Sequence, residues 1–131
     1  MAEATIRAVL KAYVAAWVAG DVAAVVASYH DDFELTYFGA NALSGHHVGK
    51  PAALAVLGEF TRRSGRQLIG TPAVLAGDAR GVVIARERLG SGEAAIEADR
   101  VLVYTIADDR LRTCCVYDSD QAAIDRLIGP A

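Results

Sequence analysis

The second half of the chain reads as four consecutive strands, and this pattern restricts the fold more than any other feature. The strand-like segments cover residues 67–76, 81–89, 94–106 and 111–118. Residues typical of turns separate them at Gly77-Asp78, Gly90-Ser91-Gly92 and Asp108-Asp109. Because successive strands joined by short turns pair antiparallel, the pattern predicts an antiparallel meander. Pro72 predicts that the first of these strands lies at a sheet edge or carries a bulge.

Before these strands, the chain shows the spacing of amphipathic helices. Apolar residues at i, i+3, i+4 and i+7 predict a first helix over residues 3–18. Its buried stripe is formed by Ile6, Val9, Leu10, Tyr13, Val14 and Trp17. Gly20 is suited to ending this helix, and Asp21 to capping the start of a second one. The inner face of the second helix is expected to carry Val22, Val25, Val26 and Tyr29.

One more strand and two more helices complete the prediction. Apolar and polar residues alternate over 33–37, which predicts a half-buried strand, and a polar, glycine-bearing loop follows over 39–49. A third helix is expected over about 51–63 and a short closing helix over 119–128. This order predicts a single α+β domain over residues 1–131, with helices across one face of a curved sheet.

The composition excludes several classes of partner. The chain has 131 residues, is 53% hydrophobic and carries a net charge of −3. Such a chain has no general attraction for nucleic acids or anionic membranes, and it contains no apolar run long enough to span a bilayer. The one basic cluster, formed by Arg62, Arg63 and Arg66, is interpreted as a solvated helix end.

The cellular location is inferred from the N-terminal stretch and the cysteines. The stretch MAEATIRAVL lacks the basic start and the apolar run of a secretory signal. Cys114 and Cys115 are adjacent, and neighbouring residues on a strand point to opposite faces, so a disulfide between them is not expected. These features predict a protein of a reducing compartment, the cytoplasm.

Three stretches of the chain carry a resemblance to a known superfamily. They are AYVAAWVAGDVAAVVASYHDDFELTYFG at 12–39, LSGHHVGKPAAL at 43–54 and RVLVYTIADDRLRTCCVYDSD at 100–120. In this order and spacing, the chain resembles the nuclear transport factor two-like superfamily, which includes ketosteroid isomerases, SnoaL-like polyketide cyclases and limonene epoxide hydrolases. The resemblance implies a cone-shaped, curved antiparallel sheet of the cystatin-like and SnoaL-like type. Three helices of the first half would enclose an apolar pocket with it, and the convex face would form a homodimer.

The resemblance also implies roles for single residues. Tyr13 occupies the position at which ketosteroid isomerases place a tyrosine that hydrogen-bonds a developing enolate. Their carboxylate base corresponds to Tyr37 or, with one residue of slack, to Thr36, and their protonated aspartate corresponds to Leu102. Neither Tyr37 nor Thr36 serves as that base without unusual tuning, since the pKa of a free tyrosine is about 10.

The two other enzyme groups are compared in the same way. The histidine and the aspartate of SnoaL-type cyclases correspond to Leu102 and Val116. Limonene epoxide hydrolases use an arginine and two carboxylates, of which only the arginine has a counterpart, at Arg86. Each of the three mechanisms therefore lacks essential groups in this chain, whereas the fold does not depend on them.

Strand alternation predicts that three sets of side chains face the pocket. The sets are Ile84, Arg86 and Arg88; Arg100, Leu102, Tyr104 and Ile106; and Cys114, Val116 and Asp118. Buried arginines need a partner, for which Asp118 or a bound anion would serve. The pocket wall is expected to be completed by Trp17, Tyr37, Leu57 and Phe60. The convex face would then carry Val83, Ala85, Leu89, Val101, Val103 and Tyr117.

Several of these residues also have a purely structural interpretation. Arg86 and Arg88 can lie at the rim with only their stems buried. Tyr13 and Trp17 can be ordinary core residues. Cys114 is interpreted as a small hydrophobic residue rather than a nucleophile, because no histidine is predicted near it.

The three histidines, His30, His46 and His47, do not have the spacing of a metal site. Adjacent histidines on a loop rarely converge on one ion without a third ligand, so no metal is expected. The chain also has no dinucleotide or phosphate-binding motif, and no cofactor is expected. Since histidine titrates near neutral pH, His46 or His47 is instead interpreted as an acid or base at the pocket mouth.

Together, the residues favour a small enzyme that acts on an apolar, carbonyl-bearing molecule of polyketide or terpenoid type. Proton transfer would lead to isomerisation, cyclisation or dehydration. Tyr13 would stabilise an oxyanion, Arg86 or Arg88 would hold an anionic group, and Asp118 or a histidine would move protons. One alternative is a non-catalytic protein that binds or sequesters a small hydrophobic ligand, which the missing carboxylates favour. A further alternative is a dimerising interaction module.

Overall fold

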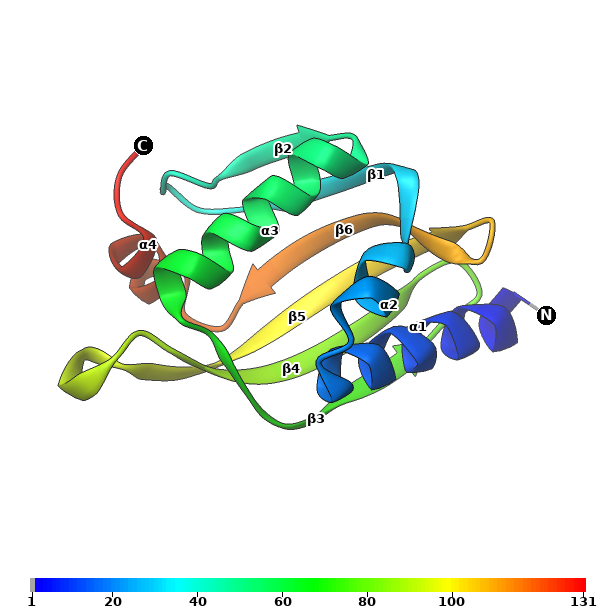
Figure 1. Ribbon diagram of the computed structural model, residues 1–131, viewed down its shortest axis with the longest axis horizontal. Coiled ribbons are helices and arrows are strands. Elements are labelled where there is room, and N and C mark those ends of the chain that lie inside the picture. Colours follow the sequence, from blue (N-terminus) through cyan, green and yellow to red (C-terminus); the bar gives the residue numbers. More distant parts are fainter. Residues whose placement is uncertain (1) are drawn as a thin grey trace.

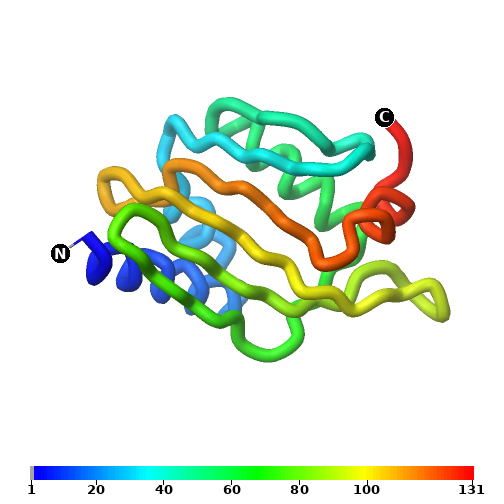
Figure 2. The backbone as a smooth tube through the Cα atoms, turned by 180° about the vertical axis from the view of Figure 1, so that it is seen from behind, coloured from blue at the N-terminus to red at the C-terminus, as the bar shows by residue number. Residues whose placement is uncertain are grey.

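The computed structural model describes residues 2–131 and consists of one sheet with helices on one side (Figure 1). Along the chain, the elements are α1 (Ala2–Ala19), α2 (Val22–Ala27), β1 (Tyr29–Tyr37), β2 (Gly45–Val48), α3 (Lys50–Ser64), β3 (Gln67–Ala76), β4 (Gly81–Leu89), a 3₁₀ turn (Gly92–Ala94), β5 (Ile96–Ala107), β6 (Arg110–Asp118) and α4 (Gln121–Ile128). The strands form a six-stranded sheet in the order β2-β1-β6-β5-β4-β3. Helices α1, α2 and α3 lie in front of the sheet in Figure 1, and Figure 2 shows the strands in front of these helices.

The predicted meander is present, but the sheet is not wholly antiparallel. Strands β3 to β6 pair antiparallel with their neighbours in the chain, and β1 pairs antiparallel with β2. Strand β1 instead runs parallel to β6, with Tyr37 opposite Val116. A parallel pair needs a long connection, which α3 and the meander supply here. Strand β2 lies in the stretch predicted as a loop, and β3 is an edge strand whose register shifts around Pro72, as predicted.

The start of α2 follows the predicted signals, but its end does not. Gly20 has a φ of +69°, the left-handed conformation that commonly follows a helix. The side chain of Asp21 accepts a hydrogen bond from the Ala24 amide at 3.1 Å and caps α2. The helix ends before Tyr29, which is the first residue of β1 rather than part of the helical inner face. The ring centroid of Tyr29 lies 4.6 Å from that of Phe33, and this burial of Tyr29 in the core outweighs the weak helix preference of a valine-rich segment.

The predicted face of β4 is wrong. Arg86 and Arg88 are exposed, and the buried positions of the strand are Gly81, Val83, Ala85, Glu87 and Leu89. The pairing of β4 with β5 explains this, because Ala85 lies opposite Arg100 and directly paired residues share a face. Since Arg100 faces inward as predicted, Ala85 and Glu87 face inward too. The face that carries two arginines is turned to solvent.

The same correction applies to the outer face of the sheet. Val83, Ala85 and Leu89, which were predicted there, are fully buried on the inner face. Ile84, predicted to face the pocket, is partly exposed on the outer face instead. Val101 and Val103 are half-buried and Tyr117 is exposed, and these three residues lie on the outer face as predicted.

The core fills the space between the sheet and its helices. Side chains with no exposed surface come from α1, β1, α3, β4 and β6, and include Leu10, Phe33, Phe60, Leu89 and Leu111. Helix α1 packs mainly against β3 and α2, and it also contacts β4. None of the helices within residues 2–131 has both the length and the hydropathy that crossing a membrane requires.

The contact between α1 and β4 depends on a glycine, and a substitution tests it. A Cβ atom added at Gly81 would collide with the fully buried Leu10 and lie 2.7 Å from Ile6. We expect Gly81→Ala to lower the free energy of unfolding by about 1–3 kcal/mol, because overpacking displaces α1. Gly58→Ala in α3 is the matched control, since its Cβ would meet no atom within 4 Å and alanine favours a helix. Urea denaturation measures both, and equal effects of the two substitutions would contradict this packing.

Candidate functional site

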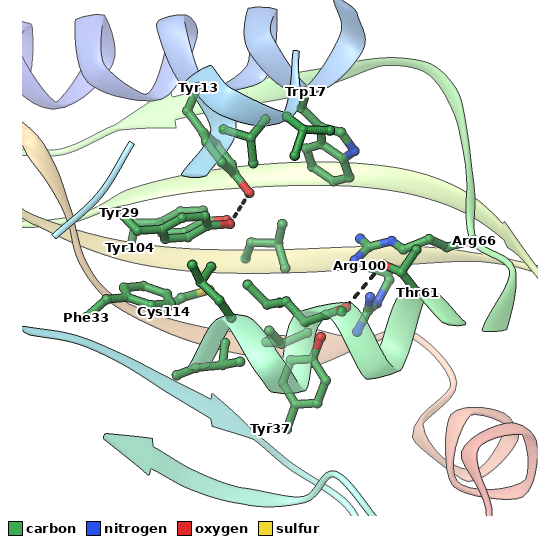
Figure 3. Close-up of a pocket in the computed structure, with 18 residues that line it drawn as sticks. Tyr13, Trp17, Tyr29, Phe33, Tyr37, Thr61, Arg66, Arg100, Tyr104 and Cys114 are labelled. Atoms are coloured by element: carbon green, nitrogen blue, oxygen red, sulfur yellow. Dashed lines mark hydrogen bonds between the residues drawn. The ribbon is translucent and has the colours of Figure 1, made fainter. Parts of the chain in front are cut away.

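A cavity of about 500 Å³ lies between the helix-covered face of the sheet and helices α1, α2 and α3 (Figure 3). Its wall is mostly aliphatic and aromatic, which suits a small apolar ligand. The lining residues are Tyr13, Trp17, Val22, Val25, Tyr29, Phe33, Leu35, Tyr37, Leu54, Leu57, Gly58, Thr61, Arg66, Arg100, Leu102, Tyr104, Cys114 and Val116. The polar groups of this wall are four phenols, two guanidiniums, a hydroxyl, a thiol and the indole N–H of Trp17.

A pair of phenols forms one polar group of the cavity. The hydroxyls of Tyr13 on α1 and Tyr29 on β1 are 2.6 Å apart, so one donates a hydrogen bond to the other (Figure 3). The ring of Tyr104 on β5 packs edge-on against Tyr13 at 5.8 Å. Burial raises the pKa of Tyr13 and, more strongly, those of Tyr29 and Tyr104. These phenols are therefore neutral at pH 7 and act as hydrogen-bond donors.

The second polar group is a chain of buried ion pairs. Arg66 donates two hydrogen bonds to the carboxylate of Glu87, at 2.6 and 2.5 Å. Arg100 donates to Asp118 at 2.6 Å and also lies 3.6 Å from Glu87. The side chains of Glu87, Arg100 and Asp118 are 1%, 1% and 4% exposed. Two positive and two negative charges balance one another, which is the condition under which charges are tolerated in an interior.

Aromatic rings hold the two guanidiniums in place. The Arg66 Cζ atom lies 5.3 Å from the ring centroid of Trp17 and 5.2 Å from that of Phe60. The Arg100 Cζ atom lies over Phe60 at 4.0 Å. Burial disfavours the charge of Arg66, but the hydrogen bonds to Glu87 and the charge of Glu87 outweigh burial and raise the pKa of Arg66. Burial likewise opposes the charge of Arg100, and its interactions with Tyr37, Asp118 and Glu87 raise the pKa above the usual value.

The structure places most of the predicted pocket residues at the cavity. Nine line its wall: Tyr13, Trp17, Tyr37, Leu57, Arg100, Leu102, Tyr104, Cys114 and Val116. Phe60 and Asp118 lie behind this wall, where each contacts Arg100. Asp118 is the predicted partner of a buried arginine, but its bond to Arg100 leaves it no free approach to a ligand.

Besides Ile84 and Ile106, which are not among the lining residues, three predicted site residues lie outside the cavity. Arg86 and Arg88 lie on the outer face, where Arg86 is 48% exposed and bonded to Asp99 at 3.1 Å. His46 is exposed in β2, with its Nε2 atom 2.8 Å from Glu34. Pairing of this stretch with β1 turns it into a sheet edge instead of a loop at the pocket mouth. Within residues 2–131, no three side chains of the kinds that hold metal ions cluster together.

The sequence pattern did not indicate Arg66, Glu87 or Tyr29 as site residues. Arg66 was interpreted as part of a solvated helix end, but it follows the left-handed Gly65 after α3 and turns back to Glu87. A signal was available in β4. Its alternate residues Val83, Ala85, Glu87 and Leu89 form one face, on which only Glu87 is polar. One carboxylate on an otherwise apolar face indicates a buried cationic partner.

The family of the protein follows from a match over most of its length. The model of the SnoaL-like domain matches residues 10–113, so the chain belongs to the SnoaL-like domain family. This match confirms the superfamily that the sequence resembles. No curated protein matches the sequence.

Solved structures share the fold over nearly the whole chain. Bal32a, from a soil-derived mobile gene cassette, matches with a TM-score of 0.82 and 19% identity, over 98% of this chain and 100% of that one. TerC, co-crystallised with polyporic acid, gives 0.75 and 20% identity over 95% and 98% of the two chains. A candidate polyketide cyclase from Xanthomonas campestris pv. campestris gives 0.74 and 15% identity over 97% and 99%. These likenesses confirm the predicted α+β fold with a curved sheet.

The buried ion pairs give a prediction for stability. We expect Glu87→Gln to lower the free energy of unfolding by about 3–5 kcal/mol, because it leaves Arg66 and Arg100 with one carboxylate between them. Glu97→Gln is the matched control, since Glu97 is 49% exposed and lies 3.7 Å from Arg86 on the surface. Its effect should stay within about 0.5 kcal/mol. Denaturant titration measures both variants, and a Glu87→Gln protein as stable as the control would contradict the network.

The two cysteines give a prediction for reactivity. Burial raises the pKa of the Cys114 thiol to about 12, so its thiolate is scarce at pH 8, whereas Cys115 is half-buried on the opposite face. We expect a disulfide reagent that releases a coloured thiolate to titrate one thiol in the folded protein and two after unfolding. Cys115→Ser should remove the rapid reaction of the folded protein with the reagent. Rapid reaction of the Cys114 thiol in that variant would contradict the burial of Cys114.

Proposed function

We propose that this protein is a small-molecule enzyme that acts on an apolar, carbonyl-bearing substrate of polyketide or terpenoid type by proton transfer. It would act as an isomerase, cyclase or dehydratase. The observation that carries this proposal is the pair of Tyr13 and Tyr29, two phenols joined at 2.6 Å in the wall of an apolar cavity. Membership of the SnoaL-like family and the likeness to a candidate polyketide cyclase support it.

The phenol pair would bind the carbonyl oxygen of the substrate. Because one phenol donates to the other, the pair keeps one hydroxyl hydrogen for a ligand. As the neighbouring C–H gives its proton to a solvent water molecule, negative charge develops on the bound oxygen. A donor fixed in apolar surroundings stabilises that charge mainly in the transition state, which raises the rate.

The choice of substrate follows from the rest of the lining. Within the described chain, the lining residues include no aspartate, glutamate or histidine, and the nearby Glu87 and Asp118 are bound to arginines. A substrate that ionises readily by itself, such as one with a C–H between two carbonyl groups, does not need a strong base. The guanidinium of Arg66 lines the cavity, but its charge is already balanced by Glu87. In this proposal, Asp118 acts by holding Arg100.

A second candidate function is the binding or sequestration of a small hydrophobic ligand without reaction. The observation that favours it is the same lack of a free carboxylate or histidine in the lining, among the residues that the structure describes. The two functions differ in one measurable property: an enzyme accelerates proton exchange at the carbon beside the bound carbonyl, whereas a binding protein leaves it unchanged.

Hydrogen–deuterium exchange of a bicyclic ketone tests the proposal. We expect the protein to accelerate exchange of the activated α C–H of 2-tetralone in D₂O, followed by NMR. Tyr13→Phe should reduce this acceleration about ten- to a thousandfold, because it removes one of the two hydrogen-bonded hydroxyls that would bind the carbonyl oxygen. Circular dichroism should show that the variant remains folded.

Tyr117→Phe serves as the matched control, since Tyr117 is an exposed tyrosine of the outer face. It should exchange the probe at the wild-type rate. Saturable binding without acceleration would overturn the enzyme and favour the binding protein. Acceleration that survives Tyr13→Phe would contradict the role given to the phenol pair.

A further inference from the structure

The hydroxyl of Tyr37 is a polar group of the cavity that the proposed reaction does not use. Tyr37 is the last residue of β1, is 6% exposed and lines the cavity. Among residues 2–131, its buried hydroxyl has no hydrogen-bond partner. Buried hydroxyls are seldom left without one, because a group that has lost its water and gained no partner destabilises the fold. A molecule that enters the cavity is the remaining source of a partner.

The ring that carries this hydroxyl is fixed by its neighbours. It packs edge-on against Phe60, with ring centroids 5.8 Å apart and planes at 88°. The Arg100 Cζ atom lies 5.8 Å from the centroid of the same ring. On either side of β1, Tyr37 pairs with Val116 and Gly45. The position of the hydroxyl oxygen is therefore set before a ligand arrives, which lowers the entropy lost on binding.

The surroundings of this hydroxyl select a hydrogen-bond acceptor. Burial raises the pKa of Tyr37, although the nearby charges of Arg100 and Arg66 partly offset this, so the phenol is a neutral donor at pH 7. Glu87 and Asp118 already balance both arginines. No full negative charge is needed on the ligand at this point, and an uncharged carbonyl oxygen is sufficient.

Figure 3 shows that the two donors belong to different walls of the cavity. The bonded hydroxyls of Tyr13 and Tyr29 lie on the side of α1, whereas the hydroxyl of Tyr37 points inward from the opposite side of the view, toward Arg66 and Arg100. We propose that Tyr37 determines specificity by donating to a second, uncharged carbonyl oxygen of the substrate. The substrate class is then a compact apolar compound with carbonyl groups at both ends. This inference rests on the proposed function, since Tyr13 and Tyr29 bind the first oxygen.

Two ketones of nearly equal size and shape test this inference. Bicyclohexyl-4,4′-dione has a carbonyl at each end, and 4-cyclohexylcyclohexanone has only one. We expect Tyr37→Phe to weaken binding of the dione about three- to tenfold and to leave the monoketone unchanged, because one hydrogen bond is lost. Isothermal titration calorimetry measures the Kd of each ketone. The ratio of the two Kd values is then compared between wild type and variant, so that the difference in hydrophobicity between the probes cancels.

Tyr117→Phe is again the control and should keep the wild-type ratio of the two Kd values. A ratio that is the same in wild type and Tyr37→Phe would overturn the second oxygen site while leaving the proposed function intact. If neither ketone binds the wild-type protein, the proposed function itself fails, and the inference with it.

The stability of the free variant gives an independent measurement. Because the Tyr37 hydroxyl has no hydrogen-bond partner in the part of the chain that the structure describes, we expect Tyr37→Phe to unfold at or above the wild-type temperature. A clear fall in Tm would mean that the hydroxyl holds the fold together, and this would overturn its assignment to ligand recognition. Tyr13→Phe gives the contrast, since it breaks an existing buried hydrogen bond and should lower Tm.

Discussion

The buried ion pairs that join Arg66, Glu87, Arg100 and Asp118 are the interaction on which the rest of the structure depends. They connect the segment after α3 to β4, β5 and the end of β6, which are far apart in the sequence. Each charge has partners of opposite sign, and the rings of Trp17 and Phe60 cover the guanidinium of Arg66. Loss of any one member leaves a buried charge without its partner, so the four residues form a single unit.

This unit also explains why the cavity is rich in donors and poor in bases. The carboxylates nearest the cavity are both bound to arginines, and burial keeps the phenols and the Cys114 thiol protonated. What remains for a ligand is a set of fixed hydrogen-bond donors in an apolar wall. Such a site stabilises charge on a ligand oxygen better than it removes a proton. The chemistry is therefore shared between the protein and an acidic substrate in the function we propose.

Much of the fold could be predicted because local patterns fix it. The apolar stripe of α1, the aspartate that caps α2 and the turns of the meander act within a few residues of the chain. Strand β2 and the parallel pairing of β1 with β6 could not be read in this way. Both depend on contacts between segments that lie far apart in the chain. The periodicity of a strand does not show which other strand it pairs with.

For the site, the sequence determined the kinds of side chain but not all of their directions. It placed Tyr13, Arg100 and Asp118 on the inner side, because the neighbours of each have one clearly apolar face. In β4 both faces carry aliphatic residues, so alternation alone allowed Arg86 inside in place of Glu87. Only the tertiary structure decided this, since the pairing of Ala85 with Arg100 sets which face of β4 is buried. It also brought Arg66 to Glu87, because the position of a side chain beyond a helix end depends on the elements packed around it.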